Sequence, residues 1–278
     1  MSVNKLIERK VNFMSNFLVQ YEHNDAIHQG DQAALSVECA AVVEAINIQN
    51  WSDPENKIGC DLGSLSLVQR AYCKEYLQKV VPVGSIEFVE AVLKGGYGIS
   101  NIAPQNIPRP LLTYEFCGRK VVPACEAGAV VGLMDKFGVK RLFIKSAERS
   151  KTDLTGIYKT ADLEANWNPR DEKVFVSTPV NFVSEWRVFV FRSRIVDARP
   201  YTGNHLVAPN EGRIKKMVEA MGDTLHAYTL DVGVTDSGET VVVEVHNFIA
   251  CGLYGASVSL GMYRAAYRQE IVFHEREV

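Results

Sequence analysis

The strongest constraint on the fold is a pair of β-rich segments near the C-terminus, residues 225–234 and 240–247. The stretch between them, Thr235 to Glu239, contains Asp, Ser and Gly, which are residues that close tight turns. Alternating β-branched segments joined by such a turn are typical of an antiparallel hairpin. We therefore predict a hairpin here, and with it a part of the fold that is built from antiparallel strands.

The register of this hairpin follows from the length of its turn. With a four-residue loop, Thr235 pairs with Thr240, and Asp231 then lies directly opposite Glu244 on the same face. Two opposed carboxylates repel each other, so a fold that keeps both needs a cation between them. Carboxylate oxygens suit Mg²⁺, especially when substrate phosphates complete its coordination. The register therefore predicts a metal site.

A solvated face of the sheet is the competing interpretation, because strand carboxylates usually point into water. Glu244, however, is the only charged residue in the run from Val241 to Val245. A buried carboxylate needs a partner, so the metal interpretation is favoured.

Four basic residues stand in or beside predicted strands. Lys145 ends the apolar segment 142–144, Lys120 begins another segment, and Arg187 and Arg199 belong to the predicted hairpin around residues 186–196. Several cations opposite carboxylate-bound Mg²⁺ would form a site for a nucleoside triphosphate. Lys and Arg at sheet edges, with their charged ends in water, explain any one of these residues equally well.

Composition excludes several classes of protein. The 278 residues have a net charge of -3 and no basic tail, which disfavours a nucleic-acid partner. No apolar run reaches the roughly 18 residues of a membrane span, so no membrane partner is expected, and the six scattered cysteines fit a reducing, cytoplasmic location. No Gly-Lys dipeptide is present, which excludes a standard P-loop. The Gly- and Pro-rich stretch 95–110 predicts a small α/β domain at 1–110 and a second domain at 111–278.

The order of these segments resembles the ATP-grasp superfamily. The resemblance spans roughly residues 80–270 and is closest to a small phage and bacterial clade of uncharacterised ATP-grasp proteins. Its most specific motif is Glu185-Trp186-Arg187 together with Asp231 and the strand Val243–Asn247, and the segment 81–89 is also typical of the clade.

The resemblance implies an α+β ATP-grasp fold, in which two α+β subdomains sandwich the nucleotide, preceded by the small α/β domain. It also implies ATP and Mg²⁺ as cofactors. The expected activity is that of a ligase. A small-molecule or peptide carboxylate is phosphorylated to an acyl phosphate, which an amine or thiol acceptor then attacks.

Site residues carry over from the resemblance position by position. Lys120 and Lys145 match the lysines that hold the α- and β-phosphates, and the segment from Val176 to Val180, including Ser177 and Thr178, matches the hinge that meets adenine. Glu185 and Arg187 match the acidic-x-Arg motif, and the expected catalytic residues are Arg187 and Arg199. The expected metal ligands are Asp231, Glu244, His246 and Asn247.

One departure from the superfamily pattern leaves alternatives open. The metal strand of the superfamily reads Glu-x-Asn, but here His246 occupies the Asn position and Asn247 follows one residue later. Imidazole is a poor ligand for Mg²⁺. A nucleotide-binding regulatory or interaction protein without ligase turnover is therefore the alternative, and a kinase-like phosphoryl transferase is a third possibility.

Overall fold

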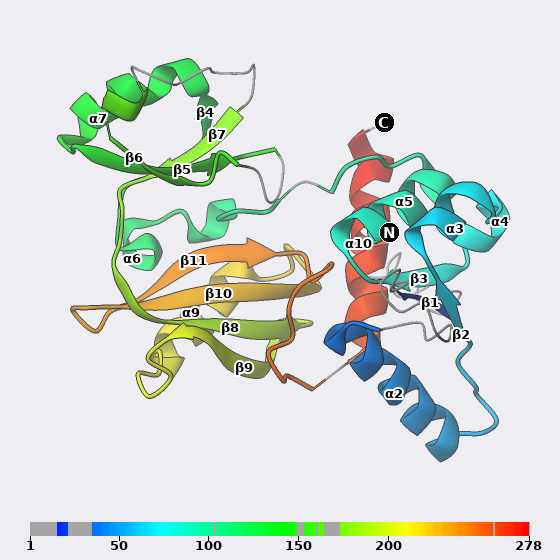
Figure 1. Ribbon diagram of the computed structural model, residues 1–278. Coiled ribbons are helices and arrows are strands. Elements are labelled where there is room, and N and C mark those ends of the chain that lie inside the picture. The colour runs from blue at the N-terminus through cyan, green and yellow to red at the C-terminus, as the bar shows by residue number, and fades with distance from the viewer. Residues whose placement is uncertain are drawn as a thin grey trace, which may run out of the picture. The chain divides into compact units, whose positions relative to one another are not determined.

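The computed structural model (Figure 1) contains two compact units, each described by itself here. The first unit comprises residues 1–102 and 248–278, and the second comprises residues 103–247. Within them the structure describes residues 16–21, 35–102, 104–148, 153–159, 161–163, 173–257 and 259–277. The predicted domain boundary at residue 110 stays a prediction.

A small parallel sheet forms the centre of the first unit. Its strands are β1 (Asn16–Gln20), β2 (Cys60–Gly63) and β3 (Val80–Val83), in the order β2-β1-β3. Every residue of β3 is buried, as expected for a parallel strand covered on both faces. The predicted strand at 80–83 is thereby confirmed.

Helices surround this sheet: α2 (Val37–Ser52), α3 (Leu65–Arg70), α4 (Lys74–Leu77), α5 (Ile86–Tyr97) and α10 (Leu260–Glu277). Ser85 caps α5, as its position before a helical pattern predicted, because its hydroxyl oxygen accepts a hydrogen bond from the Phe88 backbone N–H. Helix α10 packs against β3 and α2, so the end of the chain completes this core. In the described part of the chain, no helix has the length and apolar character needed to cross a membrane.

The second unit contains two antiparallel sheets. The first has the order β4-β7-β5-β6, with β4 (Val121–Glu126), β5 (Arg141–Ser146), β6 (Gly156–Lys159) and β7 (Lys173–Ser177). Helix α7 (Val130–Phe137) packs on this sheet through Val130 and Met134, which join a buried cluster with Leu142 and Val174. Short helical segments flank it: η1 (Arg109–Leu111), α6 (Tyr114–Cys117) and η2 (Ala127–Ala129).

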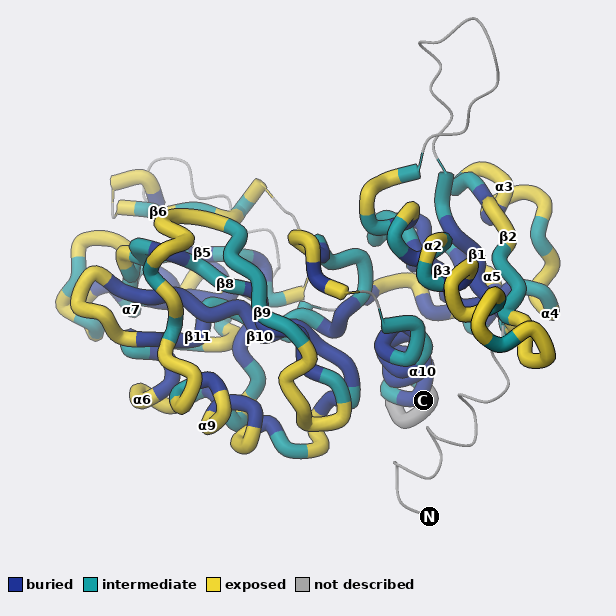
Figure 2. The backbone as a smooth tube through the Cα atoms, turned by 90° about the horizontal axis from the view of Figure 1, so that it is seen from below, coloured by how far each residue is buried: buried dark blue, intermediate teal, exposed yellow. Residues whose placement is uncertain are grey.

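The other sheet of this unit has the order β11-β10-β8-β9. Its strands are β8 (Phe182–Phe191), β9 (Arg194–Gly203), β10 (Ala227–Thr235) and β11 (Thr240–His246), and helix α9 is Glu211–Met221. Figure 2 shows β10 buried along its whole length, whereas β9 is partly exposed. Asn210 caps α9 and Gly222 ends it, as predicted.

The first hairpin of this sheet turns more tightly than its sequence predicted. The expected turn was Arg192 to Arg194, but Arg194 already belongs to β9. Arg192 and Ser193 form the turn alone, with φ values of 50° and 59°. Two left-handed residues match the right-handed twist of the flanking strands, which explains the two-residue loop.

The register of the second hairpin departs from the prediction near its turn. Thr240 pairs with Val234, not with Thr235, because the backbone N–H of Thr235 instead bonds to the carbonyl of Glu239. Between Asp231 and Val232 the register shifts, which leaves Val243 as an extra residue in β11. This bulge restores the predicted pairing of Asp231 with Glu244.

Candidate functional site

A row of four charged residues crosses the second sheet of the second unit. Glu244 on β11 pairs with Asp231 on β10, Asp231 pairs with Arg187 on β8, and Arg187 pairs with Arg199 on β9. Directly paired residues in an antiparallel sheet share a face. The sheet therefore presents two acids beside two bases in one line, each on a different strand.

Arg187 and Asp231 form the centre of this row. The guanidinium donates through Nε to Oδ1 at 2.8 Å and through Nη2 to Oδ2 at 2.7 Å. The Asp231 side chain is only 1% exposed, and that of Arg187 only 8%. The guanidinium also lies 5.7 Å from the centre of the Tyr201 ring. A planar fork facing a carboxylate fixes both side chains, so this pair is a rigid part of the site.

Glu244 receives two partners from different directions. Lys145, on β5 of the other sheet, donates from Nζ to Oε2 at 2.6 Å, and His246 Nε2 lies 2.7 Å from Oε1. Burial by itself raises the pKa of Glu244, but the hydrogen bond with His246 and the charge of Lys145 outweigh it and hold the pKa below its usual range. Glu244 is therefore an anion at physiological pH.

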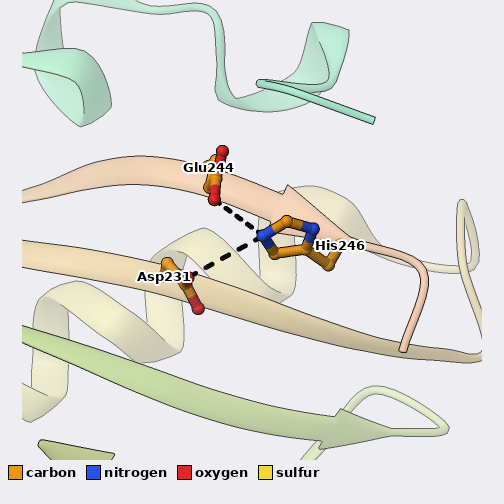
Figure 3. A group of neighbouring side chains, drawn as sticks. All are labelled: Asp231, Glu244 and His246. Atoms are coloured by element: carbon orange, nitrogen blue, oxygen red, sulfur yellow. Dashed lines mark hydrogen bonds and ion pairs between the residues drawn. The ribbon is translucent and has the colours of Figure 1, made fainter. Parts of the chain in front are cut away.

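Asp231, Glu244 and His246 converge on one point (Figure 3). Their candidate ligand atoms all lie within 4.8 Å of one another, and His246 Nε2 faces both carboxylates, 4.0 Å from Asp231 Oδ2. The two carboxylates fit Mg²⁺, which prefers oxygen ligands. The imidazole nitrogen is better suited to transition metals, so the fit to Mg²⁺ rests on the two acids.

A further acid lies beside the row. Glu185, on β8, accepts a hydrogen bond from the Tyr201 hydroxyl at 2.9 Å. Burial raises the pKa of Glu185; the hydrogen bond from Tyr201 opposes that rise, and the charges of Asp231 and Glu244 add to it. Burial, Asp231 and Glu185 also raise the pKa of Tyr201, so its hydroxyl stays protonated and acts as a donor.

The other predicted residues are less closely connected to this cluster. The Lys120 side chain is exposed, donates to the Phe137 carbonyl at 3.2 Å and lies over the Phe137 ring; within the described residues it pairs with no acid. Arg199 is bound by Asp197, with Nη2 to Oδ2 at 2.9 Å. Asn247 is buried directly after β11.

The predicted hinge continues β7 towards β8. Val176 and Ser177 end β7 in buried positions, and Thr178 follows with its backbone N–H bonded to the Lys120 carbonyl. A strand end with a backbone already tied to its neighbour offers a fixed edge for a planar ring. The structure thus brings together Lys145, Arg187, Asp231, Glu244 and His246, and it leaves Lys120 and the hinge outside this contact network.

Three residues of the network were missed in the sequence. Tyr201 and Asp197 each lie two residues from Arg199, which is the spacing of same-face strand residues and could have signalled both. Arg119 donates from Nη1 to the Val242 carbonyl at 2.7 Å and so holds the strand that carries Glu244. Nothing local in the sequence links Arg119 to β11, which lies more than a hundred residues later.

A family model for an ATP-grasp domain, the second family of its clade, matches residues 116–260, just over half of the chain. The chain belongs to this ATP-grasp family. The match includes both antiparallel sheets and the charged row, and it confirms the resemblance and the α+β ATP-grasp fold predicted from the sequence. No curated protein sequence matches the chain.

Solved structures show the same fold. An ATP-grasp RimK domain protein from Sphaerobacter thermophilus superposes with a TM-score of 0.55 at 15% identity, covering 92% of this chain and 98% of that one. D-cycloserine synthetase DcsG gives 0.53 at 12% identity, with 92% and 99% covered. The ATP-grasp ligase PsnB, complexed with a minimal precursor, gives 0.51 at 12% identity, with 94% and 99% covered. At these identities the likeness concerns the fold alone.

Proposed function

We propose that this protein is an ATP- and Mg²⁺-dependent ligase that joins a carboxylate to an amine or thiol through an acyl phosphate. The observation that carries the proposal is the convergence of Asp231 and Glu244 beside Arg187 and Lys145 on one sheet face. Family membership supports ATP as the nucleotide, and several ATP-grasp neighbours are named as ligases or synthetases. A cytoplasmic location is consistent with a need for ATP.

The proposed reaction has two steps. A carboxylate oxygen of the substrate attacks the γ-phosphorus of ATP, and ADP leaves as the acyl phosphate forms. The acceptor nitrogen or sulfur then attacks the acyl carbon, phosphate leaves, and the acceptor loses a proton. Both steps build negative charge on phosphoryl oxygens, so fixed positive charge lowers both barriers.

The residues of this chain have distinct parts in the proposal. Asp231 and Glu244 hold Mg²⁺, which, when bound, neutralises phosphate charge and orients the phosphates. Lys145 moves from Glu244 to the phosphates as they bind, and Arg187, held by Asp231, stays fixed as the cation nearest the transferred phosphoryl group. Arg199 and Lys120 supply further positive charge, and residues 176–178 receive adenine.

Trapping with hydroxylamine tests this function before either substrate is known. A pooled library of carboxylic acids is incubated with the protein, ATP, Mg²⁺ and hydroxylamine, and hydroxamates and ADP are measured by mass spectrometry. We expect both products from the wild type and a loss of roughly 100-fold or more in Glu244→Ala, as is typical when a group that stabilises transition-state charge is removed.

The matched control is Glu239→Ala. Glu239 is exposed in the turn of the same hairpin and uses only its backbone in hydrogen bonds to Thr235. Full activity in this variant, beside the loss in Glu244→Ala, assigns the effect to the site. Hydroxamate formation that persists in Glu244→Ala would contradict the proposal.

Nucleotide binding without turnover is the second candidate. It is favoured by the fact that the carboxylate oxygens of Asp231 and Glu244 are already occupied, by Arg187 in one case and by Lys145 and His246 in the other. Calorimetric titration with a non-hydrolysable ATP analogue separates the two candidates. Mg²⁺-dependent binding without any hydroxamate supports the second, and no binding excludes both.

A further inference from the structure

A cavity of about 280 Å³ lies entirely within the first unit. Gln20, at the end of β1, and Val83 and Gly84, at the end of β3, form one wall of it. Chain connections leave β1 towards β2 on one side and return to β3 on the other, so the order β2-β1-β3 reverses between β1 and β3. Crevices at the carboxyl ends of parallel strands, at such a reversal, are where open α/β sheets bind ligands.

Hydrogen-bond donors are available on this wall. The Gln20 Oε1 atom accepts from the Ser85 backbone N–H at 2.6 Å, which leaves the Gln20 amide nitrogen without a partner among the described residues. The hydroxyl oxygens of Ser36 and Ser85 cap α2 and α5, and both residues line the cavity. Both helices begin here, and helix N-termini favour negative charge. This side of the cavity suits a carboxylate.

One acid also lines the cavity. Glu38, in the first turn of α2, is half-buried, and no hydrogen bond or ion pair joins it to another residue in the described ranges. A carboxylate at this position repels phosphorylated ligands and attracts an ammonium group. The lining therefore pairs a site for negative charge with a site for positive charge.

The remaining walls are apolar and come mainly from the C-terminal part of the chain. Phe248 and Tyr263 are in ring contact, with centroids 4.8 Å apart, and Val89 and Ala266 complete the surface. Tyr267 also lines the cavity. Its side chain is 2% exposed, and its hydroxyl has no hydrogen-bond partner in the described part of the chain. A buried hydroxyl without a partner calls for a polar group on a ligand.

From these contacts we infer that the cavity binds a single free amino acid, the amine substrate of the proposed ligase. The α-carboxylate lies at Gln20 and the start of α5, the α-ammonium lies at Glu38, and the side chain packs on Phe248 and Tyr263. The volume is at the lower end of the roughly 300–1,000 Å³ of small-molecule sites. Segment 248–252, which forms part of the wall, continues directly from β11, the strand that carries Glu244.

Thermal-shift and calorimetric titration of the full chain with each of the twenty common amino acids tests this inference, with and without Mg²⁺ and a non-hydrolysable ATP analogue. For each amino acid that binds, two probes are added: the matching acid without the amino group and the matching amine without the carboxylate. We expect one or a few amino acids to bind and both probes to bind at least tenfold more weakly.

Two variants locate the binding in the cavity. Glu38→Gln removes the charge at a half-buried position and should weaken amino-acid binding at least tenfold, whereas Glu44→Gln, exposed on the same helix, should not change it. Ala266→Phe fills the cavity and should abolish binding, provided that its circular dichroism and melting curve show a folded protein.

The inference rests on the proposed function, but the two can fail separately. Wild-type protein that binds the ATP analogue but no amino acid in either condition overturns the inference alone. Binding that is equal in Glu38→Gln, or equal for the amine-free acid, also overturns it. Protein that binds an amino acid but no nucleotide overturns the ligase and leaves the cavity as an amino-acid site.

Discussion

The buried pair of Arg187 and Asp231 shows how one residue position depends on another. Each charge would be costly in this environment without its partner, because removal of one member of a buried pair leaves the other uncompensated. We expect Asp231→Asn to lower the free energy of unfolding by about 3–5 kcal/mol. Urea denaturation without Mg²⁺ or nucleotide measures this effect independently of ligand binding.

A double replacement provides the control for this pair. Arg187→Met combined with Asp231→Leu removes both charges and should recover most of the lost stability, since apolar pairs of similar volume often replace buried ion pairs without cost. If the double variant loses as much as the two single variants added together, the residues are not coupled.

Glu185 makes a prediction about pH. Its folded-state pKa is raised, mainly by burial, so the ionised carboxyl opposes folding at high pH and this penalty disappears below the pKa of the unfolded chain. We expect Glu185→Gln to melt at a higher temperature than the wild type at about pH 8 and at the same temperature near pH 4, close to the unfolded pKa of Glu. The amide oxygen still accepts from Tyr201.

Scanning calorimetry across this pH range measures the difference. Glu239→Gln is the control, because this exposed acid in the hairpin turn should show no pH-dependent gain. A constant difference between Glu185→Gln and wild type at all pH values would show that the charge is not its origin.

At the scale of the element, β11 is an edge strand that carries the key acid. Edge strands have backbone groups without a strand partner. Here Arg119 donates to the Val242 and Val243 carbonyls, beside the bulge, and the Asn106 carbonyl accepts from the Val245 N–H. These contacts hold β11 in the irregular geometry that places Glu244 opposite Asp231.

Arg119→Met should therefore loosen β11. We expect a loss of about 1–3 kcal/mol for each carbonyl left unsatisfied, and faster hydrogen exchange of the β11 amides. Lys215→Met, which breaks an exposed pair with Glu211 on α9, should change neither quantity measurably. Unchanged exchange in β11 of a folded Arg119→Met variant would contradict the role assigned to Arg119.

At the scale of the molecule, the first unit is discontinuous in sequence. Its sheet lies within the first 83 residues, but α10 packs on β3 and supplies the buried residues Tyr263, Ala266 and Tyr267. The second unit, residues 103–247, is continuous. The two ends of the chain therefore depend on each other for one core.

Truncation after residue 257 tests this dependence. We expect the remaining part of the first unit to lose its fold, because β3 and α2 lose their apolar partner, while residues 103–247 stay folded. Limited proteolysis with mass spectrometry should show rapid cleavage within residues 35–102 and continued protection of β8 and β10. Equal protection of both regions would show that α10 is dispensable.

The sequence by itself determined the local elements and part of the site. Alternation of apolar residues and turn chemistry predicted β5, β7 and the two hairpins, and the pairing of Asp231 with Glu244 followed from strand register. Such features depend on neighbours a few residues apart, whose steric and hydrogen-bonding preferences are written locally.

Only the tertiary structure decided which charges meet. Lys145 reaches Glu244 across two sheets, Lys120 binds Phe137 instead, and Arg119 secures a strand more than a hundred residues away. The bulge at Val243 corrected a register that the turn alone predicted wrongly. These outcomes depend on long-range packing and on the cost of unsatisfied buried groups, and no local pattern encodes them.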